Sequence, residues 1–256
     1  MIKNLLPADL LKVYRDRFVA LANNEVERPP MMTLMRDVTI AKRKDVKGED
    51  YISKIQDYED DPVLFTYCQR PEVLRYITCF CGPDVKSVHT MLINKPPHAG
   101  ATGRHPLHQD LHYFPFRPAN RIACAWTALE PVTRANGCLV VLPGTHKGEL
   151  LEHGYPDWEG SQNALYHGVK NVPQEAKRVY VEMDPGDTVF FHPILIHGSG
   201  VRAGARPHAL VRMPPNAVAV AACSLGFRAP PPAGQQDERL PQGHLVPLRQ
   251  LALQVH

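Results

Sequence analysis

The 256-residue sequence contains no apolar run of about 18 residues, the length that a membrane-spanning helix requires. It also lacks a stripe of lysine and arginine with interleaved aromatic residues, and its net charge is only +3. A membrane span is therefore excluded, and nucleic acid is not an expected partner. The start of the chain is too weakly apolar for a secretory signal. Its last residues are not a peroxisomal address of the Ser-Lys-Leu type.

The cysteines lack the spacing that is typical of zinc sites or disulfide frameworks. The six cysteines form no CxxC pair and no repeated pattern, so neither a zinc ribbon nor a disulfide framework is expected. Cys124 and Cys138 lie in apolar segments, where cysteine behaves as a small buried hydrophobe. This usage fits a reducing compartment, such as the cytoplasm. The HExxH motif of zinc proteases is also missing.

The hydrophobic pattern changes its period along the chain. The first ~80 residues favour helices, from an apolar stripe in residues 11–21, from Asp61-Pro62, and from Pro71 with Gly82 as the stop. Asn136-Gly137 is a strong turn signal. Beyond residue 87 the pattern is that of short strands, and the candidates are residues 88–94, 121–127, 138–143, 188–192 and 217–221.

This order of elements predicts a mainly β fold, with two sheets or a barrel and with helices packed outside. The length suits one large domain, which we expect to span residues 1–225. After residue 200 the composition shifts toward proline and loses lysine and nearly all aromatic residues. We therefore expect residues 226–256 to be a proline-rich, poorly ordered tail.

His108-Gln109-Asp110 is the segment most indicative of chemistry. In extended backbone, residues two apart point to the same face, so His108 and Asp110 can reach one ion together. His197 follows a strongly apolar strand and is flanked by a Gly/Ser turn. Two imidazoles and one carboxylate on one side of a metal are the ligand set of non-haem Fe(II) oxygenases.

Plainer interpretations stand beside this one. With thirteen histidines in the chain, a pair two residues apart arises easily by chance. His192 is a rival to His197, although it precedes a proline and is better explained as structural. Trp126 would by default be a core aromatic residue, and Lys54 a solvated surface lysine. Zinc hydrolases also use two histidines and a carboxylate, but that interpretation needs a nearby general base.

Several long segments resemble the phytanoyl-CoA dioxygenase family. They are residues 105–115 (HPLHQDLHYFP), 136–146 (NGCLVVLPGTH), 186–193 (GDTVFFHP) and 197–200 (HGSG). Residues 91–97 (MLINKPP) and 35–40 (MRDVTI) extend the similarity. The segments occur in order and with the family's spacing, and the resemblance covers about residues 1–200.

The resemblance implies a double-stranded β-helix of the jelly-roll or cupin type. It implies Fe(II) as the metal, 2-oxoglutarate and O2 as co-substrates, and ascorbate as the reductant. The reaction would be 2-hydroxylation of a 3-methyl-branched fatty acyl-CoA, such as phytanoyl-CoA, in peroxisomal α-oxidation. His108, Asp110 and His197 match the iron ligands. Residues implied to bind 2-oxoglutarate are Lys54, Met91, Gln109, Trp126 and Ser199.

The chain departs from the family pattern after residue 200. The family has an arginine about eleven residues after the distal histidine, where it would pair with the far carboxylate of 2-oxoglutarate. Here His208 stands at that position, and Arg206 and Arg212 are out of register. Our hypothesis is that residues 201–256 derive from an out-of-frame or alternatively spliced end. Such an end would cost the fold one or two strands. The alternative to an active enzyme is thus an impaired homologue that binds metal or a protein partner without turnover.

Overall fold

A six-stranded antiparallel sheet forms the centre of the computed structural model, in the order β1-β2-β3-β12-β5-β10. Its strands are β1 (Thr33–Arg36), β2 (Ile52–Gln56), β3 (Val85–Lys95), β5 (Ile122–Ala128), β10 (Thr188–Phe191) and β12 (Ala217–Gly226). The structure describes residues 1–36, 46, 48–95, 104–156, 166–172 and 175–200, together with the course of β12.

A second, smaller sheet faces the first. Its order is β4-β11-β6-β9, with strands β4 (His105–His108), β6 (Leu139–Val141), β9 (Val179–Val181) and β11 (His197–Ser199). A short ribbon pairs β7 (His153–Gly154) with β8 (Gly168–Val169). Trp126 of β5 and Leu139 of β6 share one buried apolar cluster, so the two sheets pack face to face. This is the predicted jelly-roll arrangement, a mainly β fold with few helices.

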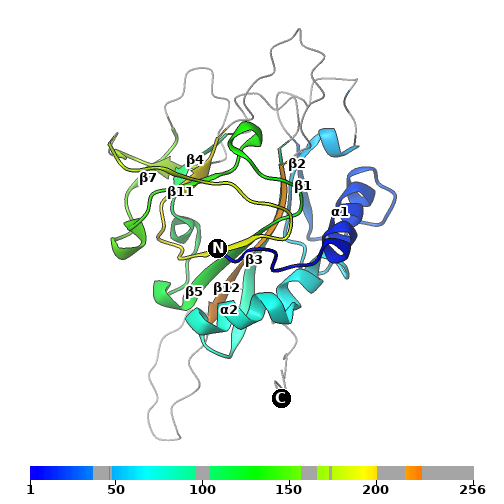
Figure 1. Ribbon diagram of the computed structural model, residues 1–256, viewed down its shortest axis with the longest axis horizontal. Coiled ribbons are helices and arrows are strands. Elements are labelled where there is room, and N and C mark those ends of the chain that lie inside the picture. Colours follow the sequence, from blue (N-terminus) through cyan, green and yellow to red (C-terminus); the bar gives the residue numbers. More distant parts are fainter. Residues whose placement is uncertain are drawn as a thin grey trace, which may run out of the picture.

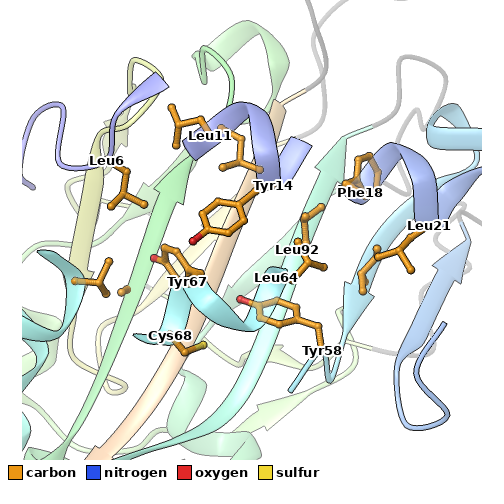
Figure 2. Close-up of a cluster of buried hydrophobic side chains, with 14 of the residues drawn as sticks. Leu6, Leu11, Tyr14, Phe18, Leu21, Tyr58, Leu64, Tyr67, Cys68 and Leu92 are labelled. Atoms are coloured by element: carbon orange, nitrogen blue, oxygen red, sulfur yellow. The ribbon is translucent and has the colours of Figure 1, made fainter. Parts of the chain in front are cut away.

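Two helices cover the outer face of the large sheet, away from β4 and β11 (Figure 1). They are α1 (Ala8–Ala22) and α2 (Pro71–Cys81). Figure 2 shows the apolar stripe of α1, with Leu11, Tyr14 and Phe18 directed at the side chains beneath it. The rings of Tyr14 and Tyr67 meet edge to face, with centroids 6.2 Å apart. Burial of each such side chain contributes about 1.5–3 kcal/mol to the stability of the fold. This packing holds the helices against the outer face of the sheet.

Successive side chains along each strand of the large sheet alternate between its two faces. One set packs in this outer core, and the other points into the space between the sheets. Along β5, Ala123 and Ala125 pack in the helix-side cluster, whereas Trp126 and Ala128 pack in the inner one. Along β3, Leu92 belongs to the helix side. Its neighbours on either side in the chain therefore face inward, toward the smaller sheet.

The helix predictions are confirmed at α1 and α2. Gly82, with a φ of 90°, follows the last residue of α2, as expected for a stop. The prediction for Asp61-Pro62 is only partly right, because the segment forms a 3-10 helix, η2 (Leu64–Gln69). The carboxylate of Asp61 accepts hydrogen bonds from the backbone N–H groups of Val63 and Leu64 and so opens this turn.

The expectation of mainly helical structure in the first ~80 residues is wrong for β1 and β2. Lys54 of β2 pairs with Ile93 of β3, and such long-range pairing decides strand formation more than local preference does. Shorter 3-10 turns complete the connections, at η1 (Gly48–Asp50), η4 (Asp110–Tyr113), η5 (Ala119–Arg121), η6 (Arg134–Asn136) and η7 (Thr145–Lys147).

Asn136-Gly137 does not form the hairpin turn that its sequence indicates. Gly137 instead ends η6 in the left-handed region, at a φ of 94°. The following strand, β6, pairs with β11 and β9, which come much later in the chain. The strand candidates at residues 88–94 and 121–127 match β3 and β5, and those at 138–143 and 188–192 contain β6 and β10.

The candidate strand at residues 217–221 is confirmed as the first half of β12. This strand pairs with β3 on one side and β5 on the other, so the large sheet is continuous at this position. His208, Arg206 and Arg212 lie outside the described residues, as do residues 227–256 of the proposed tail. In the part of the chain that is described, no helix is long and apolar enough to cross a membrane.

Candidate metal centre

His108, Asp110 and His197 converge at one end of the smaller sheet. His108 is the last residue of β4, and it lies opposite His197, the first residue of β11. The Nε2 atoms of His108 and His197 lie 3.2 and 3.5 Å from Oδ1 of Asp110. One ligand atom from each residue falls within 4.8 Å of the others, a spacing that could hold a metal ion.

The local backbone explains why Asp110 joins His108. Asp110 is the first residue of η4 rather than part of a strand, which corrects the expectation of one continuous strand. Gln109 between them is extended, with φ −119° and ψ 124°, so the alternation of side chains still holds across these three residues.

Both histidines are oriented by the same backbone device. Nδ1 of His108 donates to the carbonyl of Pro106 at 2.8 Å, and Nδ1 of His197 donates to that of Leu195 at 2.9 Å. Each imidazole therefore presents Nε2, with its lone pair, to the space beside Asp110. Burial lowers the pKa of His197 to about 4, although Asp110 acts in the opposite direction. A neutral imidazole is the form that binds metals.

The carboxylate of Asp110 is held from two sides. Oδ1 faces the histidines, and Oδ2 accepts a hydrogen bond from the Cys124 thiol at 3.1 Å. Burial alone would raise the pKa of Asp110, but His197, His108 and the thiol lower it below its ordinary value. The group is thus an anion inside the protein, as a metal ligand must be. Cys124 was predicted only as a buried hydrophobe. Its position two residues before Trp126, on the same face of β5, is the sequence signal that could have indicated a place beside the centre.

Gln109 points away from this centre and is fully engaged by the backbone. Its amide nitrogen donates to the carbonyls of Glu149 and Ile194, at 3.0 and 2.8 Å. Its amide oxygen accepts from Leu151 N–H at 2.8 Å. The side chain joins two loops behind the metal ligands, and it shows no free donor that could turn toward a co-substrate.

Lys54 is buried instead of lying on the surface. Its side chain comes from β2, is 7% exposed and has its ammonium 5.0 Å from the centre of the Tyr166 ring. The ring of Tyr166 lies tilted against that of His105, with centroids 4.1 Å apart, and His105 lies tilted against His108, with centroids 4.8 Å apart. Burial lowers the pKa of Lys54 to about 8, partly offset by Asp57. A buried cation is thereby held close to the candidate metal ligands.

Met91 and Trp126 lie in one row on the inner face of the large sheet. Ala221 of β12 pairs with Met91 on one side and with Trp126 on the other, so the three positions are in register. Trp126 is 7% exposed, and its indole nitrogen has no hydrogen-bond partner among the residues that the structure describes. Buried indole N–H groups normally have one. This donor suits the carboxylate of a bound small molecule.

Ser199 lies two residues beyond His197 and is joined to a lysine that the sequence did not single out. The ammonium of Lys95 donates to Ser199 Oγ at 2.8 Å and to the carbonyl of Gly200 at 3.3 Å. Burial lowers the pKa of Lys95 to about 8. Lys95 could have been found from its position, because it has the same parity as Met91 in β3.

His192 is not part of the cluster of three. Its Nδ1 instead accepts a hydrogen bond from the backbone N–H of Ile194 at 3.2 Å, which agrees with the structural role expected for it. Two nitrogens and one carboxylate oxygen suit Fe(II) and also Zn²⁺. The donors around the centre add a preference for an anionic small molecule.

Known proteins resemble this chain along most of its length. A family profile described as phytanoyl-CoA dioxygenase (PhyH) matches residues 1–207. The human protein "Phytanoyl-CoA dioxygenase, peroxisomal" is 55% identical over 201 residues, which are 78% of this chain and 59% of that protein. A probable phytanoyl-CoA dioxygenase of Caenorhabditis elegans is 55% identical over 204 residues, which are 78% of this chain and 65% of that protein. The chain thus spans less than two thirds of the length of these relatives.

Solved structures share the fold at low sequence identity. The epimerase SnoN, crystallised with Fe3+, alpha ketoglutarate and nogalamycin RO, superposes with a TM-score of 0.62 at 17% identity, covering 96% of this chain and 89% of that one. EctD from S. alaskensis, in its apoform, superposes with a TM-score of 0.61 at 16% identity, covering 88% of this chain and 71% of that one. The fold, the profile match and the identity to its relatives agree, and the chain belongs to the phytanoyl-CoA dioxygenase family.

Proposed function

We propose that this protein is an Fe(II)- and 2-oxoglutarate-dependent oxygenase that hydroxylates a 3-methyl-branched fatty acyl-CoA, such as phytanoyl-CoA, at carbon 2. The observation that carries the proposal is the buried triangle of His108, Asp110 and His197. Both imidazoles are locked with Nε2 inward, and the carboxylate between them is ionised. The relatives' names support the acyl-CoA substrate and the peroxisome as the location.

In this proposal the residues of the centre have different roles. His108, Asp110 and His197 hold the metal on one side, which leaves the opposite side for 2-oxoglutarate and O2. The ammonium of Lys54, the indole N–H of Trp126 and the hydroxyl of Ser199 are donors for the carboxylates of 2-oxoglutarate. Met91 and Trp126 add apolar surface that keeps water from the reacting atoms.

Bound Fe(II) would supply the oxidation, in which O2 and 2-oxoglutarate yield succinate and CO2 while one oxygen atom enters a C–H bond of the acyl chain. We include ascorbate as the reductant that keeps the iron ferrous. The pKa values of His197 and Asp110 both lie below their ordinary values, so His197 is neutral and Asp110 ionised, the forms that bind a metal. We assign residues 1–225 to the catalytic domain and 226–256 to a tail.

The side chain of Gln109 is committed to the backbone around it. Both amide hydrogens and the amide oxygen are engaged by Glu149, Ile194 and Leu151. We propose that Gln109 acts by supporting the ligands on either side of it, and that any contact with 2-oxoglutarate is secondary to this support.

The test is succinate formation from 2-oxoglutarate with Fe(II), ascorbate and phytanoyl-CoA, followed by detection of the 2-hydroxyacyl product. We expect succinate and product in equal amounts from the protein as it is. Asp110→Ala should abolish both, because an iron held by two histidines alone loses its anionic ligand. Unchanged turnover by that variant would reject the assignment of the ligands.

The second candidate is a homologue that binds iron without turnover. It is favoured by one observation, the histidine at position 208, where the family resemblance places an arginine for the far carboxylate of 2-oxoglutarate. This candidate predicts iron binding with no succinate, even in the uncoupled reaction without acyl-CoA. Any Asp110-dependent succinate would exclude it.

A further inference from the structure

A buried lysine lies on the inner face of the large sheet and contacts β11, the strand that carries His197. Lys95 is the last residue of β3 and is 7% exposed. Lys95, Ile93 and Met91 alternate with Leu92, which packs on the helix side, so all three point between the sheets. Ile93 belongs to the inner apolar cluster, which confirms this direction.

The side chain of Lys95 is held in place at both ends. A Cβ atom built on Gly137 would lie 3.4 Å from both Cδ and Cε of Lys95, so the glycine leaves the space that the lysine stem fills. The φ of 94° at Gly137 also disfavours any larger residue there. At the other end, the ammonium reaches Ser199 Oγ at 2.8 Å. The cation is therefore directed before any ligand arrives.

Ser199 sets the distance between this cation and the metal ligands. It follows His197 by two residues on β11, so both side chains leave the same face of the strand. Two residues of strand advance by roughly 7 Å. A five-carbon diacid that is bound to the metal through its 2-oxo end extends by a similar length, which brings its far carboxylate to the Ser199 hydroxyl.

The two buried lysines have different neighbours. The ammonium of Lys54 lies 5.0 Å from the centre of the Tyr166 ring. The ammonium of Lys95 instead contacts Ser199 Oγ and the carbonyl of Gly200, on the strand that carries His197.

We propose that Lys95, with Ser199, binds the carboxylate of 2-oxoglutarate that is remote from the metal. This rests on the proposed function, which already needs a cation at that end of the co-substrate. An ammonium and a hydroxyl that are already in contact can both donate to one carboxylate oxygen. No reaction step is assigned to Lys95, which acts by binding and orienting.

The experiment compares two ligands on the full chain loaded with Mn(II), so that binding is measured without turnover. The ligands are 2-oxoglutarate and 2-oxopentanoate, which has the same carbon chain with a methyl group in place of the far carboxylate. The variants are Lys95→Met, Lys95→Arg and Ser199→Ala. Lys12→Met, which removes an exposed lysine of α1, is the matched control.

We expect Lys95→Met to weaken 2-oxoglutarate binding by roughly 10- to 100-fold, the range for loss of a charged hydrogen bond. Binding of 2-oxopentanoate should be nearly unchanged, because that ligand has nothing for Lys95 to hold. Lys95→Arg should recover part of the loss, and Lys12→Met should match the unaltered protein. Equal losses for both ligands, or none for either, would overturn the proposal.

Two further outcomes separate this proposal from the proposed function. If the unaltered protein forms no succinate with Fe(II), yet binds 2-oxoglutarate in a Lys95-dependent way, the function fails and the role of Lys95 stands. If succinate forms normally and Lys95→Met leaves the affinity unchanged, the function stands and the role of Lys95 fails. Should Lys95→Met not fold, Ser199→Ala decides, with a smaller loss expected for 2-oxoglutarate alone.

Discussion

The thiol of Cys124 lies 3.1 Å from Oδ2 of Asp110 and donates a hydrogen bond to it. The two residues come from different elements, β5 and η4, and the contact crosses between the sheets. It leaves Oδ1 of the carboxylate directed at His108 and His197. A strand of the large sheet thus orients Asp110, a candidate metal ligand that lies just after β4 of the smaller sheet.

Cys124→Ala should weaken Fe(II) binding by about 10-fold, the lower end of the effect of losing a partner that orients a ligand. Cys124→Ser should retain most of the affinity, because a hydroxyl can donate to the same oxygen. Metal titration of the apoprotein would measure this. Cys79→Ala, at an exposed cysteine of α2, is the control. Equal affinities for the alanine and serine variants at position 124 would show that the thiol does not orient Asp110.

The affinity for 2-oxoglutarate should fall as the pH rises above about 8. Burial lowers the pKa of Lys54 and of Lys95 to about 8, while Asp57 acts against this at Lys54 and Cys138 at Lys95. A lysine loses its charge as the pH rises through its pKa, so both cations are lost well below the ordinary value of 10.5.

Calorimetric titration of the Mn(II)-loaded protein between pH 7 and about 9.5 would measure this dependence. The same titration with 2-oxopentanoate is the control, and its affinity should change less because it lacks the second carboxylate. A flat profile for 2-oxoglutarate would mean that neither lysine carries its binding.

Gln109→Ala should destabilise the fold by about 1–2 kcal/mol, because it removes three partly buried hydrogen bonds to the backbone of Glu149, Ile194 and Leu151. Urea unfolding of the apoprotein would measure the change. Gln69→Ala, at a half-buried glutamine of η2, should cost much less. If Gln109→Ala unfolds like the unaltered protein but loses 2-oxoglutarate binding, the direct contact implied by the family resemblance is correct after all.

Asp61→Ala should be among the most damaging changes outside the metal centre. Asp61 is fully buried and receives two hydrogen bonds at Oδ2 from Arg17, at 3.0 and 2.9 Å, while also holding the first turn of η2. Removing one partner of a buried pair costs about 3–5 kcal/mol. The matched control is Asp16→Ala, which breaks the exposed pair with Lys12 and should cost at most about 1 kcal/mol. Similar unfolding midpoints for the two variants would contradict this prediction.

Parts of the centre could be predicted because their signals are local. His108 and Asp110 are two residues apart in extended backbone, and that spacing alone sends both side chains to one side. The strands of β3 and β5 also follow from their apolar, β-branched composition. Lys54, by contrast, is by default a surface residue in the sequence. It is buried because β2 pairs with β3, and no local pattern encodes that pairing.

The surroundings of Gln109 and Lys95 come only from the tertiary structure. The family resemblance directs Gln109 to the co-substrate, and its amide also bonds three backbone groups from distant loops. Lys95 drew no attention as the residue before two prolines, and it gains meaning only from Ser199, which is 104 residues away in the chain. Contacts of such long range depend on how the sheets are stacked.

By itself the sequence determined the candidate ligand types, the alternation that sends His108 and Asp110 to one side, and most of the strands, because these follow from covalent spacing and local preference. Only the tertiary structure decided that β11 lies beside β4, that Cys124 reaches Asp110 and that Lys54 and Lys95 are buried. The physical reason is that packing two sheets face to face brings distant residues together and removes their charges from water.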